Sequence, residues 1–167
     1  MEHSWNRGII SSMKKLLFIS SEGGHLNEML QLDELFNEHE YLVVTERTEA
    51  TEFVKEKYKN HTYLKYGTQD HLIPYLFIFP FNIIKSFFIF LRFKPDAVIT
   101  TGTHTAVPMC YIAHFFKKKV IYIETLASID EISKAGKMVY NIADVFVVQW
   151  SELLAKYPKA VCWGWIY

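Results

Sequence analysis

Short apolar runs alternate with amphipathic segments along this chain, and the alternation restricts its fold more than any other feature of the sequence. The predicted strands cover residues 16–19, 41–44, 63–66, 97–99, 120–123 and 145–148. The predicted helices cover residues 26–36, 50–58, 106–116 and 134–142. Strands that are apolar on both faces and joined by helices are typical of a parallel sheet with helices on both sides. We therefore expect an α/β, Rossmann-like fold that binds ligands at the carboxyl ends of its strands.

The length of the chain favours a single domain. A chain of 167 residues buries one core of reasonable size and rarely two. We find no repeat or linker that would divide residues 13–167, which we expect to form that domain. Residues 1–12 lack the apolar core of a signal peptide, and we expect them to be a disordered extension.

Charge and cysteine content exclude several classes of function. The chain has 18 basic and 18 acidic residues, so no overall field attracts nucleic acid, and we expect no nucleic-acid partner. Cys110 and Cys162 lie far apart without the spacing of a metal site, and Cys110 falls in an apolar run typical of a buried free thiol. We expect a cytosolic, reducing compartment, no metal and no cofactor.

The first predicted strand leads through Gly23 and Gly24 to His25 at the start of a helix. A glycine pair permits a tight turn and a close approach of a ligand, and the start of a helix offers free N–H groups. This pattern indicates a phosphate. The alternative is a tight strand-to-helix turn that His25 merely caps.

Two later strand ends repeat the theme. Gly102, Thr103 and His104 follow the fourth predicted strand and enter a helix, so their backbone donors are expected to face the same crevice. In the alternative, His104 is an ordinary first-turn helix residue. Glu124 ends the fifth strand, where a carboxylate must either face the crevice or accept hydrogen bonds, so we expect a ligand or network role.

Residues 72–93 are crowded with aromatic side chains and interrupted by two prolines. We expect this stretch to be too broken to span a bilayer, which needs about 20 apolar residues. Helical spacing places Ile83, Ile84, Phe87, Phe88 and Leu91 on one face, which we assign to the core. Outside that face lie the residues that we expect to contact a membrane surface, namely Ile89, Phe90 and Phe93 with the cations Lys85 and Arg92. The alternative is that the whole stretch is core or a subunit contact.

Several motifs occur in an order that points to a known family. They are Gly-Gly-His-x-x-Glu-Met-Leu within residues 17–30, Lys-Pro-Asp-Ala-Val-Ile-Thr-Thr-Gly at 94–102, Val-Pro at 107–108, Ile-Tyr-Ile-Glu at 121–124 and Gly-Trp-Ile-Tyr at 164–167. Together they resemble the asparagine-linked glycosylation protein 14 family, above all its bacterial capsule and exopolysaccharide members. The resemblance covers nearly everything after Met13.

The resemblance implies the amino-terminal half of a bipartite GT-B glycosyltransferase that is inactive alone. Its implied partner is a separate nucleotide-sugar-binding subunit, which transfers a sugar from a UDP-sugar to a polyprenyl-diphosphate-linked saccharide at the cytoplasmic face of the membrane. Attachment to that membrane would be peripheral. The acceptor would lie at Gly23, Gly24, Gly102, Thr103 and His104, with His25 contacting its hydroxyl or diphosphate. Glu124 would hydrogen-bond a sugar or orient His25.

The aromatic tail Trp163, Trp165, Ile166 and Tyr167 is expected to pack against that partner, or alternatively to fold back on the sheet of its own chain. Two rival functions remain. One is a non-catalytic membrane scaffold. The other is a self-sufficient nucleotide-binding enzyme, which fits poorly because the Gly-x-Gly-x-x-Gly pattern is missing and Glu46 only loosely matches a ribose-binding acid.

Overall fold

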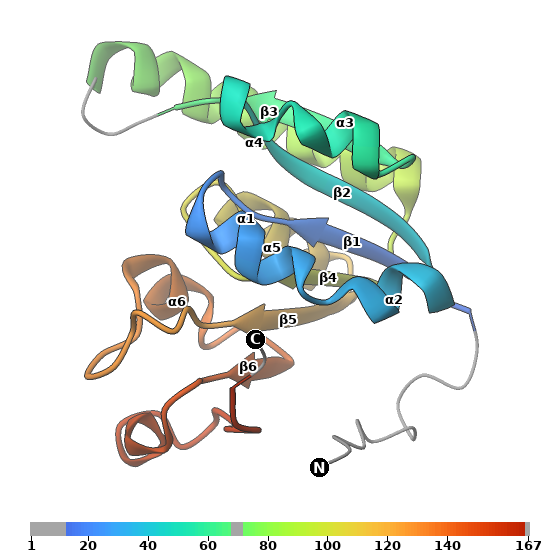
Figure 1. Ribbon diagram of the computed structural model, residues 1–167. Coiled ribbons are helices and arrows are strands. Elements are labelled where there is room, and N and C mark those ends of the chain that lie inside the picture. Colours follow the sequence, from blue (N-terminus) through green and yellow to red (C-terminus); the bar gives the residue numbers. More distant parts are fainter. Residues whose placement is uncertain (1–12, 68–71, 166–167) are drawn as a thin grey trace.

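A six-stranded parallel sheet forms the centre of the computed structural model, which describes residues 13–67 and 72–165, with the side chains of 72–75 left out. The strands are β1 (Lys15–Ile19), β2 (Glu40–Arg47), β3 (His61–Lys65), β4 (Ala97–Thr100), β5 (Lys119–Ile123) and β6 (Val145–Val147). Their spatial order is β3-β2-β1-β4-β5-β6, as Figure 1 shows. The predicted fold class is therefore confirmed. The predicted extension at 1–12 and the tail residues Ile166 and Tyr167 lie outside the described residues.

Helices cover both faces of this sheet. They are α1 (Gly24–Leu30), α2 (Asp33–Glu38), α3 (Phe53–Lys57), α4 (Leu72–Phe93), α5 (Val107–Phe115) and α6 (Lys134–Val139), with short 3-10 turns η1 (Glu49–Thr51) and η2 (Ser151–Ala155). Alternate side chains of β1 supply both cores. Leu16 and Phe18 pack with α1 to α3, whereas Leu17 and Ile19 pack with α4 to α6.

The strand order places a crevice between β1 and β4. The chain continues from β1 to β2 and β3 on one side, then crosses to β4 on the other side of β1. Such a reversal separates the loops that follow the two central strands, and open α/β sheets bind ligands at this point. The loops after Ile19 and Thr100 border that crevice.

α4 is one continuous helix, contrary to our expectation that its prolines break it. Pro74 lies in the first turn, where an N–H group has no partner within the helix, and Pro80 is accommodated inside it. Within the described residues, Leu76–Phe93 is long and apolar enough to cross a membrane by length and composition, and 17% of this stretch is buried inside the protein. Figure 1 shows α4 lying along β3 at one edge of the sheet.

The face of α4 that packs on the core is the opposite of the predicted one. Phe90 is only 3% exposed and Ile89 and Phe93 pack against the core, so the predicted membrane contact of these three residues is wrong. The face that we assigned to the core points outward, with Ile84 58% and Phe88 64% exposed. Of the two predicted cations, Lys85 is half-buried and Arg92 is exposed.

Two polar residues explain the reversal. Asn82 and Ser86 are buried on the inner face, one and two turns before Phe90. The Asn82 side chain accepts a hydrogen bond from Lys65 N at 3.0 Å and donates one to Lys65 O at 2.8 Å. Because the β3 edge satisfies this amide, the polar positions turn inward and the uninterrupted apolar face turns outward.

Candidate functional site

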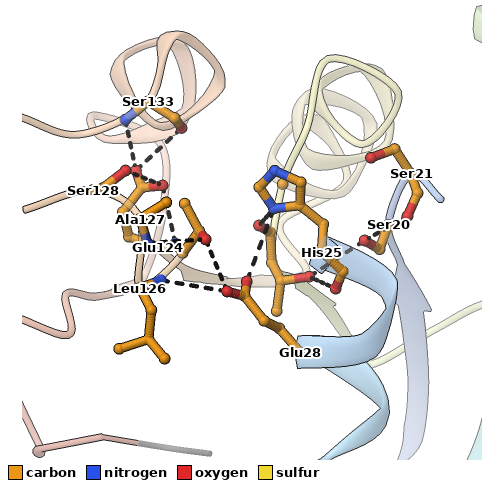
Figure 2. A network of polar contacts seen from close by, with 12 residues as sticks. Ser20, Ser21, His25, Glu28, Glu124, Leu126, Ala127, Ser128 and Ser133 are labelled. Carbon is orange, nitrogen blue, oxygen red and sulfur yellow. Dashed lines mark hydrogen bonds and ion pairs between the residues drawn. The ribbon is translucent and has the colours of Figure 1, made fainter. Parts of the chain in front are cut away.

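His25 stands at the crevice between β1 and β4, at the start of α1. Its Nδ1 lies 2.8 Å from the Thr101 carbonyl oxygen, which can only accept, so Nδ1 carries a proton. In the neutral ring Nε2 is then the unprotonated nitrogen, and the described residues give it no hydrogen-bond partner. Figure 2 shows this second nitrogen on the side of the ring away from the other contacts. A quarter-exposed imidazole held in this tautomer can accept a proton from a ligand.

Gly102 lies directly against that imidazole. It has a φ of 102°, and a Cβ there would lie 3.5 Å from His25 Nδ1 and 3.1 Å from the Tyr122 hydroxyl. Both the backbone conformation and the close packing require glycine at this position. The predicted juxtaposition of the two glycine-containing loops is thus present in the structure.

Gly23 and Gly24 line the other side of the turn. Gly23 has a φ of 80°, and a Cβ at either glycine would meet nothing within 4 Å. Open space therefore lies beside both residues, and a ligand can approach the backbone there.

Glu28, which sequence reasoning did not single out, connects His25 to the loop after β5. Its Oε1 accepts hydrogen bonds from Thr125 Oγ1 at 2.8 Å and Leu126 N at 3.3 Å. Its Oε2 lies 3.9 Å from His25 Nδ1 (Figure 2). The signal that could have revealed Glu28 is its spacing, because a residue three positions after His25 lies on the same face of a helix.

Glu124 is fully buried at the carboxyl end of β5. Its Oε1 accepts from Thr125 N and Ser128 Oγ, and its Oε2 accepts from Ser133 N and Ser133 Oγ, at 3.0 to 3.2 Å. Burial raises the pKa of the Glu124 carboxyl, although these hydrogen bonds lower it. The network role expected for a carboxylate at this position is present.

The orienting role predicted for Glu124 is wrong in this structure. Among the described residues Glu124 does not contact His25, whose ring is held by Thr101 instead. Glu124 instead fixes the loop before α6, where Ser133 caps the helix by accepting from Gly136 N at 3.0 Å. A Cβ at Gly136 would lie 2.3 Å from Glu124 Oε2, so the helix start and the carboxylate are closely fitted.

His104 and Thr103 do not join His25. His104 Nε2 lies 3.2 Å from the Gly67 carbonyl, beside a small cavity bounded by β2, α4 and α5. The Thr103 hydroxyl is buried and has no hydrogen-bond partner among the described residues. The predicted substrate contacts of these two residues thus stay predictions, with His104 directed to a different cavity from His25.

Glu46 lines the same small cavity. It is 2% exposed and accepts a hydrogen bond from Thr105 Oγ1 at 2.6 Å. Burial raises the pKa of Glu46, although the Thr105 hydrogen bond and the nearby His104 lower it. A carboxylate enclosed in this way is not placed to bind a ribose, which weakens the alternative of a self-sufficient nucleotide enzyme.

Comparison with known proteins now identifies the family. A family model described as "Oligosaccharide biosynthesis protein Alg14 like" matches residues 16–166. The chain belongs to this Alg14-like family. It is 28% identical to the UDP-N-acetylglucosamine transferase subunit ALG14 of Mus musculus, over 90% of this chain and 82% of that protein. It is 26% identical to the subunit of the same name from Candida albicans, over 90% of this chain and 77% of that protein.

The fold of this Alg14-like protein also occurs in solved structures of larger enzymes. It superposes on MurG of Acinetobacter baumannii with a TM-score of 0.68 at 15% identity, covering 83% of this chain and 42% of MurG. A UDP-N-acetylglucosamine 2-epimerase from Rickettsia bellii gives 0.69 at 16% identity, covering 93% and 46%. The chain spans less than half the length of these structures and has the fold of one Rossmann-like half of a GT-B enzyme.

The tail of the Alg14-like chain is partly anchored. Val161 forms a parallel bridge with Val147 of β6, so the chain folds back on its own sheet up to this point. Beyond it, Trp163 is 50% and Trp165 61% exposed. The Trp165 ring lies 5.8 Å from that of Trp150, whose Nε1 donates to the Leu126 carbonyl at 2.8 Å. The tail therefore presents indole surface beside the loop that Glu28 and Glu124 position.

Proposed function

We propose that this Alg14-like protein is the acceptor-side, membrane-associated subunit of a two-protein glycosyltransferase in capsular or exopolysaccharide assembly. The observation that carries the proposal is the match over nearly the whole chain to transferase subunits of the same family. In the proposal a separate subunit binds the UDP-sugar and this chain binds a polyprenyl-diphosphate-linked saccharide. Neither chain would transfer sugar alone, because the cleft of a GT-B enzyme lies between two such domains.

The arrangement at the crevice supports an acceptor site at His25. The unprotonated Nε2 is available to take the proton of the acceptor hydroxyl, while the open space at Gly23 and Gly24 leaves room for the diphosphate. The hydroxyl oxygen would bond to the anomeric carbon as the bond from that carbon to the UDP oxygen breaks. The proton would go to Nε2, and UDP would leave with the electron pair. Glu124 would act as a positioning residue for the loop beside this site.

The outward face of α4 supports attachment to the cytoplasmic face of the membrane. Its inner face is committed to the sheet through Asn82 and Phe90, which favours a helix that lies on the membrane surface. The exposed apolar side chains on its outer face are Leu76, Phe77, Phe81, Ile84, Phe88 and Leu91. These replace Ile89, Phe90 and Phe93 as the proposed membrane contact.

Reconstitution with a partner tests the proposal. The partner is a chain of similar size with a nucleotide-sugar-binding pattern encoded beside this one, and the donors are UDP-glucose, UDP-galactose and UDP-N-acetylglucosamine. We expect sugar transfer to a polyprenyl-diphosphate-linked acceptor by the pair and none by either chain. Transfer by this chain alone would contradict the proposal. A pair whose activity survives substitution of His25 would favour the non-catalytic scaffold.

A further inference from the structure

An open cleft of about 710 Å³ lies along the outer edge of β3, where the strand meets α4. Three cations line it, Arg47 from the end of β2, Lys65 from the end of β3 and Lys85 from α4. The remaining side chains around it are neutral or imidazole, and no acidic residue of the described chain lines the cleft. β3 is the edge strand and β2 separates it from β1, so the cleft is distinct from the crevice at His25 (Figure 1).

The charge in this cleft is not neutralised within the described residues. Their ion pairs engage Lys15, Lys55, Lys118, Lys119, Lys137 and His25. Arg47, Lys65 and Lys85 form no ion pair with an acidic side chain of the described chain. The exposed carboxylate of Glu52 is near enough to Arg47 to be influenced by it, but Glu52 pairs with Lys55 at 2.7 Å. Three cations around one concave surface attract an anion with several oxygens.

The cleft also borders the outward apolar face of α4. Lys65 Nζ lies 4.3 Å from the centre of the Phe81 ring, which is itself 43% exposed. Lys85 follows Ile84, one of the more exposed apolar residues of the helix. A ligand with a phosphate in the cleft could therefore place a hydrocarbon chain along α4 without crossing polar surface.

From this geometry we infer that the β3–α4 cleft binds the phosphate of an anionic membrane phospholipid, whose acyl chain lies along the outer face of α4. The inference rests on the membrane attachment proposed above and adds a lipid specificity to it. Cations that hold a phosphate beside an inserted apolar face also fix the orientation of the helix on the membrane. The crevice at His25 would thereby keep a constant orientation to the membrane that supplies its acceptor.

Flotation of the full chain with vesicles tests the inference, using phosphatidylcholine alone and phosphatidylcholine mixed with phosphatidylglycerol at one ionic strength. We expect the wild type to prefer the anionic vesicles, and the double variant Lys65→Gln/Lys85→Gln to lose that preference by roughly tenfold. The matched control, Lys134→Gln/Lys159→Gln, removes the same charge from exposed positions near the other edge of the sheet and should retain it. An equal loss in both variants would mean a general charge effect and would overturn the inference.

Two further arms separate the possible failures. Inorganic phosphate at constant ionic strength should not displace the wild type from anionic vesicles; displacement would indicate a site for free phosphate rather than lipid. Ile84→Ser/Phe88→Ser should lower binding to both vesicle types. If it does not, the membrane attachment of the proposed function fails. If it does, while the Lys65/Lys85 variant keeps the anionic preference, only the cleft inference fails.

Discussion

His25 and Thr101 are joined by two hydrogen bonds that run in opposite directions. His25 Nδ1 donates to the Thr101 carbonyl at 2.8 Å, and Thr101 Oγ1 donates to the His25 carbonyl at 2.6 Å. The first bond sets the tautomer of the ring, and the second ties the turn after β1 to the end of β4. Because Thr101 is fully buried, this pair fixes the imidazole at the crevice without help from a ligand.

The pair predicts the effect of replacing His25 by asparagine. An asparagine amide can imitate Nδ1 as a donor to Thr101, but it has no counterpart of Nε2. We expect His25→Asn to fold normally, with a melting temperature close to that of the wild type. Its rate of sugar transfer with the partner should fall by at least about 100-fold, the usual effect of losing a general base. A rate within a few-fold of the wild type would show that Nε2 does not accept the proton.

A second prediction concerns Gly102. Gly102→Ala forces an unfavourable φ and brings a methyl group to 3.1 Å from the Tyr122 hydroxyl, so we expect a loss of about 1–3 kcal/mol in the free energy of unfolding. Gly24→Ala is the matched control, because open space surrounds that position and its φ is ordinary. Its stability should match or slightly exceed that of the wild type in urea denaturation. Equal destabilisation by the two changes would contradict the close packing at Gly102.

Glu46 provides a pH-dependent test of the cavity at the end of β2. Burial raises the pKa of Glu46 above its ordinary value of 4.5, so the folded protein holds this proton to a higher pH than the unfolded chain. The stability that the group contributes is fully present below pH 4.5 and is lost as the pH rises through the raised pKa. Glu46→Gln does not titrate and keeps an oxygen for Thr105. Its stability relative to the wild type should therefore increase from pH 4.5 to neutrality.

Glu52 serves as the control for that experiment. Its hydrogen bond with Lys55 lowers the pKa of Glu52, so Glu52→Gln should show the opposite trend, losing relative stability as the pH rises from acid toward 4.5 and above. Unfolding curves in urea across the pH range measure both differences. Parallel curves for wild type and Glu46→Gln would rule out a raised pKa at Glu46.

The sequence predicted the sheet well because each strand is a short apolar run, and runs of this kind joined by helices have few arrangements other than a parallel sheet. The predicted helix over 26–36 divides at Gln31 and Leu32, where local geometry breaks a continuous periodic pattern. The orientation of α4 failed for a different reason. The helix is apolar on nearly every side, so periodicity alone does not decide which face is buried. The decision came from Asn82, whose partner is the edge of β3, a contact distant in sequence.

At the candidate site, the rule that ligands bind at strand ends was enough to place His25 and Gly102 together. It did not separate His104, which turns toward Gly67, because the direction of a loop side chain depends on neighbours that the sequence does not reveal. Glu28 was overlooked because its role arises from contacts with Thr125 and Leu126, about 100 residues away in the chain.

The revised orientation of α4 yields a direct comparison between two phenylalanines of one helix. Phe90→Ser removes a buried ring that packs 5.2 Å from Phe116, and we expect a loss of about 3–5 kcal/mol in the free energy of unfolding. Phe88→Ser removes a ring that is 64% exposed, and we expect a change within about 0.5 kcal/mol. Urea denaturation distinguishes them. Similar losses for both variants would mean that the outward face is covered in solution.

The last prediction concerns the tail as the contact with the partner subunit. Trp163 and Trp165 are half or more exposed, and exposed indoles gathered on one surface are typical anchors of a protein interface. We expect Trp163→Ala/Trp165→Ala to weaken binding of the partner by at least about tenfold in a titration, and to reduce sugar transfer accordingly. Its melting temperature should stay close to that of the wild type, because the described tail is anchored at Val161, before either tryptophan.

Trp150→Ala is the matched control, since it also removes one indole, but from a half-buried position where its Nε1 donates to the Leu126 carbonyl. This change should lower the melting temperature by loosening the loop after β5. A tail variant that binds the partner as tightly as the wild type would refute the interface. A tail variant that melts as early as Trp150→Ala would show that the two tryptophans stabilise their own domain, and the alternative of a tail folded back on the sheet would then hold.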